Sequence, residues 1–275
     1  MGRPFLKMNG LGNDFVVVEA REGAFAPAPA EVRAIADRQS GVGCDQLIAI
    51  EPSERAEAFV RFWNADGGEV AACGNGARCA AWLLMRASGR DEARFETAAG
   101  LIDARLADGD LVTLDLGAPR LGWQDIPLAE PMDTRGVELQ VGPIDAPVLH
   151  TPGCVSMGNP HVVFFVDDLA TASVREVGPL IENHPLFPER TNVGFAQVQA
   201  RDRIALRVWE RGVGETKACG TGACAALVAA HRRRLCDRTA TVQLLGGPLR
   251  IEWRESDGHV LMTGPTAIDF TGTLP

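Results

Sequence analysis

The sequence predicts an α+β fold of two pseudo-symmetric domains, each a mixed or antiparallel β-sheet wrapped around a central helix. Three observations support this prediction: an internal repeat, short strand-like runs that end in glycine-bearing loops, and two helices that are apolar on nearly every face. With 275 residues, of which 46% are hydrophobic, the chain is long enough to bury two hydrophobic cores.

The internal repeat has a fixed offset of 146 residues. It aligns residues 59–80 with residues 205–226 without a gap, and 10 of these 22 positions are identical. Two other parts of the chain keep the same register, since 12–17 falls on 158–163 and Gln46 falls opposite Asn192. Three segments in one register indicate a duplicated domain in which each copy contributes an equivalent half-site.

The junction between the two copies is expected near residues 117–121, where Pro119 and two glycines interrupt the pattern. The last strand, near residues 264–273, is expected to return to the first domain. The predicted domains are therefore residues 1–117 together with 264–275, containing Cys73, and residues 118–263, containing Cys219.

Within each copy, apolar or β-prone runs predict strands and a longer apolar stretch predicts a helix. The stretches 78–85 and 223–230 are apolar almost all round, which indicates helices buried inside their domains. The expected strands are residues 15–19, 47–50, 60–63, 101–106, 111–116, 162–166, 204–209, 241–245 and 249–253.

The charge of the chain excludes several functions. A formal net charge of −9 disfavours binding to nucleic acid or to an anionic membrane surface, because both need clustered positive charge. No signal peptide and no apolar stretch of membrane-spanning length is evident, so we expect a soluble cytoplasmic protein. In that compartment the seven cysteines favour catalytic or core roles over a disulfide framework.

Two cysteines stand apart because each opens a Cys-Gly-x-Gly motif at the expected start of a buried helix. The motifs are Cys73-Gly74-Asn75-Gly76 and Cys219-Gly220-Thr221-Gly222, and they coincide in the repeat. The first turn of a helix offers unpaired N–H groups that can bind a carboxylate. The same position is expected to lower the thiol pKa, so that thiolate is available near neutral pH.

Two such thiols on opposite faces of one carbon can invert a stereocentre without a cofactor. One thiolate removes the α-proton while the other thiol donates a proton to the opposite face. We expect core roles for Cys44, Cys79, Cys154, Cys224 and Cys236. The spacing of the cysteines is not that of a zinc site, so no metal is expected, and a dithiol redox role does not require the Gly, Asn and Thr residues of the loops.

The chain resembles the diaminopimelate epimerase family over nearly its whole length. The resemblance is carried by an ordered set of motifs: 5–15 (FLKMNGLGNDF), 41–46 (GVGCDQ), 64–67 (NADG), 73–79 (CGNGARC), 158–161 (GNPH), 191–192 (TN), 210–216 (ERGVGET) and 219–222 (CGTG). It implies an isomerase of the same fold, with its active site in the interdomain cleft. The reaction implied is the interconversion of LL-2,6-diaminoheptanedioate and its meso isomer in lysine and peptidoglycan precursor biosynthesis.

The resemblance also implies roles for individual residues. Cys73 and Cys219 would be the acid and base, and His161 and Glu210 would influence their ionisation. Glu210 would in addition hold the α-ammonium group, and Arg211 is suited to a bidentate grip on a carboxylate. The remaining implied substrate-binding residues are Gly74, Asn75, Gly220 and Thr221 for the reacting carboxylate, Asn64, Asn159, Asn192 and Arg211 for the distal amino-carboxylate, and Asn13 and Gln46 for the rest of the pocket.

The chain departs from the family pattern in its last strand. Where relatives often carry a tyrosine associated with a homodimer contact, this chain has Phe270, and it contains no tyrosine. A homodimer is still expected, with an apolar contact at Phe270 in place of a hydroxyl hydrogen bond.

Three other functions are compatible with parts of the sequence. A proline or hydroxyproline racemase shares the two-thiol chemistry but needs no second amino-carboxylate pocket. A pyridoxal-phosphate racemase would need Lys7 or Lys217 as its Schiff base, because these are the only lysines. A binding module for a dicarboxylic amino acid would retain its ligand after loss of Cys73.

Overall fold

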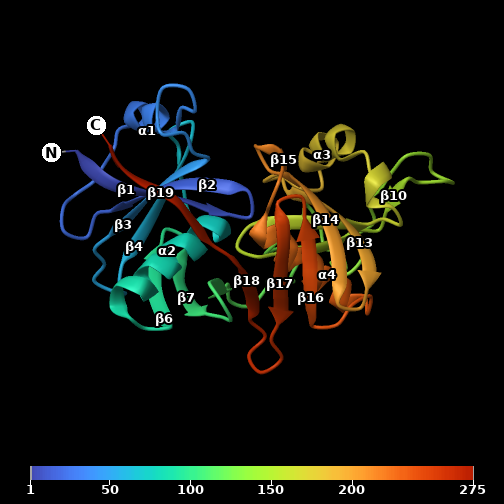
Figure 1. The fold of residues 1–275 in the computed structure, drawn as a ribbon. Coiled ribbons are helices and arrows are strands. Elements are labelled where there is room, and N and C mark those ends of the chain that lie inside the picture. The colour runs from blue at the N-terminus through green and yellow to red at the C-terminus, as the bar shows by residue number, and fades with distance from the viewer. Residues whose placement is uncertain (1, 275) are drawn as a thin grey trace. The chain divides into compact units, whose positions relative to one another are not determined.

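The computed structural model describes residues 2–274, which divide into two compact units (Figure 1). The first unit comprises the residues before Leu116 together with Thr263 and the residues after it, and the second comprises Leu116–Met262. Each unit contains its own sheet and its own central helix.

The first unit is a mixed sheet packed around helix α2 (Gly74–Ser88). Its strands follow the spatial order β19-β1-β2-β3-β4-β6-β7-β8, in which β2–β3 and β4–β6 are parallel and the other pairs are antiparallel. The elements are β1 (Arg3–Gly10), β2 (Asn13–Glu19), α1 (Pro29–Ala36), β3 (Gln46–Glu51), β4 (Phe59–Asn64), β5 (Glu69–Val70), β6 (Glu92–Thr97), β7 (Gly100–Leu106), β8 (Leu111–Asp115) and β19 (Ala267–Leu274).

The second unit repeats this arrangement around helix α4 (Gly220–Arg232). Its strand order is β11-β12-β13-β14-β16-β17, with β12–β13 and β14–β16 parallel. The elements are β9 (Gln140–Val141), β10 (Leu149–His150), β11 (Gly153–Ser156), β12 (Pro160–Phe165), a short 3-10 helix (Leu169–Thr171), α3 (Val174–Glu182), β13 (Asn192–Ala200), β14 (Arg203–Glu210), β15 (Gly214–Thr216), β16 (Thr239–Leu244), β17 (Gly247–Trp253) and β18 (Val260–Pro265), whose last residues belong to the first unit.

The two units share one strand register. In the first, Phe15 of β2 lies opposite Gln46 of β3, and in the second, His161 of β12 lies opposite Asn192 of β13. Both pairs are parallel, and their members are related by the 146-residue offset. The duplication and the α+β fold predicted from the sequence are therefore confirmed. The correspondence extends to elements with little sequence identity, such as α1 and α3, where Ile35 and Ile181 are the one identical pair at this offset.

The two central helices are buried to different degrees. In α4 every residue of the predicted stretch 223–230 is buried. In α2, Trp82 and Leu83 are only partly buried, while Arg78 is fully buried. Apolar side chains of the sheets complete each core, including Val16 and Leu47 in the first unit and Phe164 and Phe195 in the second.

The C-terminal part of the chain differs from the predicted single strand at 264–273. It forms two strands, β18 and β19, with Thr266 between them. Strand β19 pairs antiparallel with β1, so that Leu274 lies opposite Arg3. Throughout residues 2–274, each helix is too short or too polar to cross a bilayer.

Candidate active site

Each of the two singled-out cysteines is the N-cap residue of a central helix. Cys73 (φ −140°, ψ 118°) precedes α2, and Cys219 (φ −120°, ψ 104°) precedes α4, both in the extended conformation of an N-cap. Helices α2 and α4 therefore begin earlier than the apolar stretches alone predict, at Gly74 and Gly220. The N–H groups of the first helical turn lie next to each thiol.

The second glycine of each motif is required by packing. A Cβ atom on Gly76 would lie 2.8 Å from Ile48 Cδ1, and one on Gly222 would lie 3.2 Å from both Cys219 Sγ and Val208 Cγ2. Each helix start thus lies directly against the strands of its own sheet. The repeated Cys-Gly-x-Gly pattern reflects this close approach as well as access to the backbone.

The residues implied by the sequence fall into two half-sites. The first half-site is Asn13, Gln46, Asn64, Cys73 and Asn75, and the second half-site is their repeat counterparts Asn159, Asn192, Glu210, Cys219 and Thr221. Each half-site lies within one unit.

The second half-site contains a short hydrogen-bonded chain that ends at the Cys219 thiol. His161 Nε2 lies 3.0 Å from Asn159 Oδ1 and 3.1 Å from Thr221 Oγ1. Thr221 Oγ1 in turn lies 3.7 Å from Cys219 Sγ, within reach of a sulfur hydrogen bond. The amide of Asn159 also donates to Thr221 Oγ1, at 3.4 Å. The threonine hydroxyl therefore connects the buried histidine to the thiol.

Glu210 is the acidic neighbour of Cys219. Its carboxyl group accepts a hydrogen bond from Thr216 Oγ1 and is a hydrogen-bonding neighbour of the thiol. Burial raises the pKa of Glu210 above its ordinary value, although the bonds from Thr216 and Cys219 oppose this effect. No role for Thr216 was predicted from the sequence, and Val70 occupies its position in the first copy of the repeat.

The expected lowering of the thiol pKa is wrong for Cys219. Burial, followed by the negative charge of Glu210, raises the pKa of the Cys219 thiol well above its ordinary value. The hydrogen bonds from Gly222 and Thr221 lower the pKa of the thiol but are outweighed. Cys219 is thus a protonated thiol near neutral pH.

His161 is neutral at the same pH. Burial, with the nearby positive charge of Arg211, lowers the pKa of His161 to about 3. A neutral imidazole cannot stabilise a thiolate as a cation would, so His161 acts on the half-site through its hydrogen bonds. The corresponding residue of the first unit is Phe15, which is also buried.

Arg211 and Asn192 are held together beside Glu210. The backbone N–H of Arg211 donates to Asn192 Oδ1 at 3.0 Å, and Asn192 Nδ2 donates to the Pro160 carbonyl at 2.8 Å. The Arg211 guanidinium donates to the carbonyl of Glu189 at 2.9 Å. That bond uses one of its N–H groups, so others remain to meet a carboxylate.

The first half-site has a counterpart of the Asn159–Thr221 hydrogen bond, made by different side chains. Asn75 Nδ2 donates to Asn13 Oδ1 at 2.7 Å, while Arg78 donates to Asn75 Oδ1 at 2.9 Å. Gln46 Nε2 donates to Asn64 Oδ1 at 2.8 Å, and Gln46 Oε1 is buried without a protein donor. Such an acceptor is one that a ligand N–H group can satisfy.

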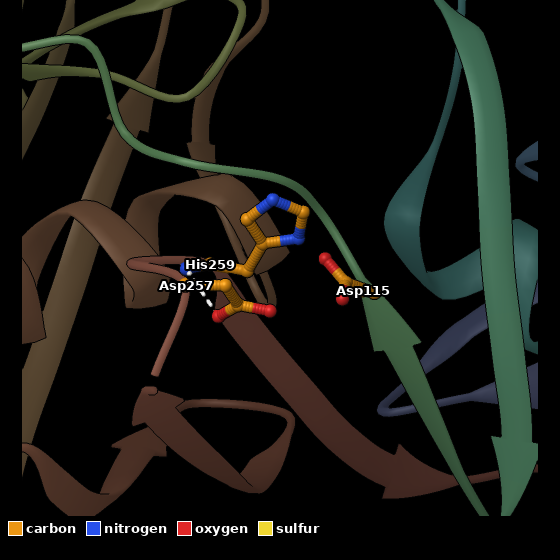
Figure 2. A group of neighbouring side chains, drawn as sticks. All are labelled: Asp115, Asp257 and His259. Carbon is orange, nitrogen blue, oxygen red and sulfur yellow. Dashed lines mark hydrogen bonds between the residues drawn. The ribbon is translucent and has the colours of Figure 1, made fainter. Parts of the chain in front are cut away.

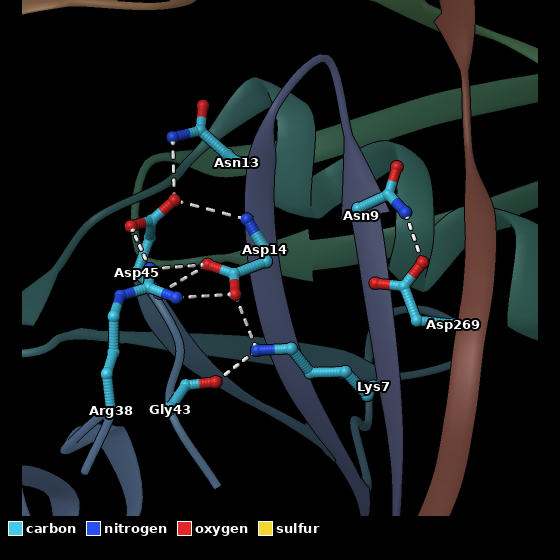
Figure 3. A network of polar contacts seen from close by, with 8 residues as sticks. All are labelled: Lys7, Asn9, Asn13, Asp14, Arg38, Gly43, Asp45 and Asp269. Atoms are coloured by element: carbon cyan, nitrogen blue, oxygen red, sulfur yellow. Dashed lines mark hydrogen bonds and ion pairs between the residues drawn. The ribbon is translucent and has the colours of Figure 1, made fainter.

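A network of charged side chains contacts the first half-site through Asn13 (Figure 3). Asn13 Nδ2 donates to Asp45 Oδ2 at 3.1 Å, and Arg38 bridges Asp45 and Asp14 at 2.7 and 2.8 Å. Lys7 donates to Asp14 and to the Gly43 carbonyl. Although burial opposes it, hydrogen bonds from Arg38 and Lys7 hold the pKa of Asp14 well below its usual range. The sequence did not predict this network, which has no counterpart in the second unit.

The network also bears on the two lysines. Lys7 is only 6% exposed and is ion-paired with Asp14 at 2.6 Å, which is unfavourable for a Schiff-base lysine that must be neutral to react. Lys217 is exposed. Phe270, the residue expected at a homodimer contact, is 49% exposed and packs edge-on against Phe5 with ring centroids 6.1 Å apart.

The remaining cysteines have the environments of core residues. Burial raises the pKa of Cys44 and Cys236 to about 11, and of Cys79 and Cys154 to about 12. Cys224 is fully buried in α4. Unlike Cys73 and Cys219, these five cysteines do not occupy the N-cap position of a described helix.

A third group of polar residues forms a tight turn before β18. Asp257 accepts a hydrogen bond from the His259 backbone N–H at 3.1 Å (Figure 2). It also accepts one from the Arg254 guanidinium, at 2.9 Å from Nε. The bonds from Arg254 lower the pKa of Asp257 to about 2. Asp115, also drawn there, is the last residue of strand β8 in the first unit. These hydrogen bonds to Asp257 stabilise the turn between β17 and β18.

Solved structures share this fold at low sequence identity. A predicted epimerase from Pseudomonas aeruginosa aligns with a TM-score of 0.69 and 17% identity, covering 99% of each chain. A hydroxyproline epimerase from Agrobacterium vitis, with bound trans-4-hydroxy-L-proline, aligns with a TM-score of 0.69 and 17% identity over 99% of this chain and 90% of that one. The chain therefore shares its fold with a class of proteins that includes epimerases. Its own two N-cap cysteines lie at positions related by the 146-residue repeat.

Sequence comparison defines the family within this class. The diaminopimelate epimerase family model matches residues 5–122 and 153–268. Diaminopimelate epimerases of Phenylobacterium zucineum and Acidiphilium cryptum are 66% and 54% identical, covering 100% and 99% of this chain and 99% and 96% of theirs. The chain belongs to the diaminopimelate epimerase family and is an isomerase.

Proposed function

We propose that this protein interconverts LL-2,6-diaminoheptanedioate and the meso isomer, with Cys73 and Cys219 as the two proton-transferring groups and without a cofactor. The activity is supported by the full-length similarity to proteins named diaminopimelate epimerase. The mechanism is supported mainly by one observation, that each of two repeat-related cysteines is the N-cap of a buried helix.

In the proposed reaction one proton is removed from the α-carbon and another is added to its opposite face. One cysteine thiolate takes the α-proton, so that an S–H bond forms while the C–H electron pair passes onto the carbon and its carboxylate. The opposite thiol then gives up its proton to the other face and becomes a thiolate. The two thiols thereby exchange roles, and the reverse reaction uses them in the reverse order.

The helix starts supply the stabilisation that this step needs. Negative charge builds up on the reacting carboxylate as the proton leaves. We assign the binding of this carboxylate to the first-turn groups Gly74, Asn75, Gly220 and Thr221, where backbone N–H donors and the positive ends of the helix dipoles are available.

Glu210 gives the substrate a means of changing the thiol pKa. The resting pKa of Cys219 is high because of burial and because of the Glu210 charge. We assign the α-ammonium group of the substrate to Glu210, and a cation bound there would offset the charge that raises the pKa of the thiol. Thiolate would then form only when substrate is present.

The distal end of the substrate is assigned to amide and guanidinium groups. Arg211 has the geometry for a carboxylate, and the buried acceptor Gln46 Oε1 suits an N–H donor. The full set of residues proposed for the distal amino-carboxylate is Asn13, Gln46, Asn64, Asn159, Asn192 and Arg211. A cytoplasmic location and a homodimer with Phe270 at the contact are part of the same proposal.

The test is an assay of LL-diaminoheptanedioate and L-proline side by side. The second substrate is included because the fold is shared with a hydroxyproline epimerase. Turnover of the first substrate alone is expected, since proline cannot engage Arg211 and the amides of the distal pocket. Turnover of proline alone would replace the proposed substrate, and turnover of neither would reject both activities.

A further inference from the structure

One buried carboxylate of the second unit has no part in the reaction described above. Glu182 is the last residue of α3, and its side chain is 6% exposed. Its carboxylate accepts three hydrogen bonds: from Trp209 Nε1 at 2.7 Å, from the backbone N–H of Gly212 at 2.8 Å and from Arg190 Nη1 at 3.2 Å. A carboxylate buried to this extent is costly unless its oxygens are satisfied in this way.

Two of these donors flank the residues assigned to the substrate. Trp209 immediately precedes Glu210, and Gly212 immediately follows Arg211. One oxygen of Glu182 holds the side chain before this pair, and the other holds the backbone after it. The chain between the two bonds cannot shift far without breaking one of them.

The third donor ties in the loop before β13. Arg190 has a positive φ of 60°, which is uncommon for a side chain of its kind, and its bond to Glu182 helps to fix that conformation. The neighbouring Glu189 carbonyl accepts from the Arg211 guanidinium. Asn192, two residues after Arg190, accepts from the Arg211 backbone. The two segments held by Glu182, residues 190–192 and residues 209–212, therefore carry Asn192, Glu210 and Arg211.

Packing adds to these hydrogen bonds. A Cβ atom on Gly178 of α3 would lie 2.5 Å from Trp209 Cγ, so the helix backbone lies directly against the indole (Figure 1 shows α3 beside β14). The ring is thus held by Gly178 on its face and by Glu182 at its nitrogen.

We infer that Glu182 is a positioning residue for substrate binding: it holds Arg211, Glu210 and Asn192 in the arrangement that receives the amino and carboxylate groups of the substrate. This inference rests on the proposed function for the identity of the substrate. It rests on the hydrogen bonds alone for the ordering of residues 209–212. No counterpart exists in the first unit, where Ala36 occupies the position of Glu182 in the repeat.

The test is Glu182→Gln, with Glu96→Gln as the matched control. Glu96 is an ion-paired carboxylate of the first unit, 16% exposed, whose side-chain partners are Ser53 and Arg55. A glutamine at position 182 places an NH2 group where one carboxylate oxygen accepted, so at least one donor loses its partner. We expect the KM for diaminoheptanedioate to rise about tenfold or more with kcat changed less than about threefold, and no change in the control.

A double-mutant cycle separates positioning from general destabilisation. Because Glu182 acts in part through Arg211, Glu182→Gln should raise the KM by a smaller factor in the Arg211→Ala background than in wild type. Independent, additive effects of the two changes on KM, or an unchanged KM in Glu182→Gln, would overturn the inference. Should Glu182→Gln fail to fold, Trp209→Phe removes one of the same hydrogen bonds while keeping an aromatic ring, and the same cycle applies.

A second measurement does not depend on activity. Hydrogen exchange followed by mass spectrometry should show faster exchange in the 209–213 segment of Glu182→Gln than in wild type or in Glu96→Gln, because at least one of the two hydrogen bonds that hold this segment, from Trp209 Nε1 and from the Gly212 N–H, is lost. Unchanged exchange there would overturn the inference whether or not diaminoheptanedioate is the substrate. If exchange is faster in Glu182→Gln but wild type does not turn over diaminoheptanedioate, only the proposed function is rejected.

Discussion

Asn75 donates a hydrogen bond to Asn13 across 62 residues of the chain, at 2.7 Å. The counterpart of this contact in the second unit joins Thr221 and Asn159, again 62 residues apart, at 3.4 Å with the direction reversed. A contact kept through duplication with different side chains indicates that what matters is the link between the helix start and the first residues of the neighbouring strand.

Removal of the Thr221 hydroxyl tests this link. Thr221→Val keeps the shape of the side chain but leaves His161 and Asn159 without one partner each and removes the contact to Cys219 Sγ. Because this hydroxyl contacts the proposed proton-transferring thiol, kcat/KM should fall at least about tenfold, which corresponds to a loss of about 1.4 kcal/mol of transition-state stabilisation. Thr221→Ser, which restores the hydroxyl, should recover most of the activity. Equal activities of the valine and serine variants would count against a role for the hydroxyl.

The raised pKa of Cys219 has a measurable consequence for its reactivity. Because the Glu210 charge is one of its causes, Glu210→Gln should lower the pKa of the thiol and increase its rate of alkylation by iodoacetamide at pH 8. The modification of Cys219 is followed by mass spectrometry of the peptide that contains it. If alkylation of Cys219 in Glu210→Gln is as slow as in wild type, the carboxylate does not control this thiol.

Much of the site follows from the repeat, and the remainder does not. The two N-cap cysteines, and the pairing of Asn13 with Asn159, could be predicted because the 146-residue offset brings like residues into register. Thr216 and Glu182 could not be predicted in this way, since Val70 and Ala36 occupy their positions in the first copy. Their roles depend on contacts between side chains of different segments, which leave no periodic signal.

The prediction of a lowered pKa for Cys219 is wrong for a related reason. A helix start lowers a thiol pKa only if other effects do not outweigh it. Burial at 4% exposure, and a carboxylate brought alongside by the end of β14, are properties of the folded unit that the local motif does not contain. The α+β fold itself was predicted because it depends on repeat, strand and helix patterns that are local.

His161 should make the stability of the protein depend on pH. Its pKa is about 3 in the folded protein and near 6.5 in an unfolded chain, so the unfolded state binds a proton more readily. The stabilisation is fully present above about pH 6.5 and is lost as the pH falls toward 3. Between pH 7.5 and pH 5 the free energy of unfolding should fall by up to about 2 kcal/mol from this residue alone.

The matched variant is His161→Phe, which places in the second unit the residue that the first unit has at Phe15. Urea unfolding at the two pH values should show a smaller pH-dependent loss in this variant than in wild type. The same loss in both proteins would mean that His161 titrates normally in the folded state.

The close approach of the helix starts predicts a large effect of a single methyl group. Gly76→Ala brings a Cβ atom to 2.8 Å from Ile48 Cδ1, and the resulting strain should lower the free energy of unfolding by about 1–3 kcal/mol. At Gly194 the nearest atom to an added Cβ lies 3.5 Å away, an ordinary contact, so Gly194→Ala should cost less. Urea unfolding compares the two, and equal losses would show that the approach at Gly76 is not tight.

The two-thiol mechanism is tested most directly by following the substrate α-proton in deuterated water. Wild type should incorporate deuterium at the α-carbon as it interconverts the LL and meso isomers, and Cys73→Ala and Cys219→Ala should each abolish the interconversion. Normal interconversion by either single variant would contradict the assignment of one thiol to each face.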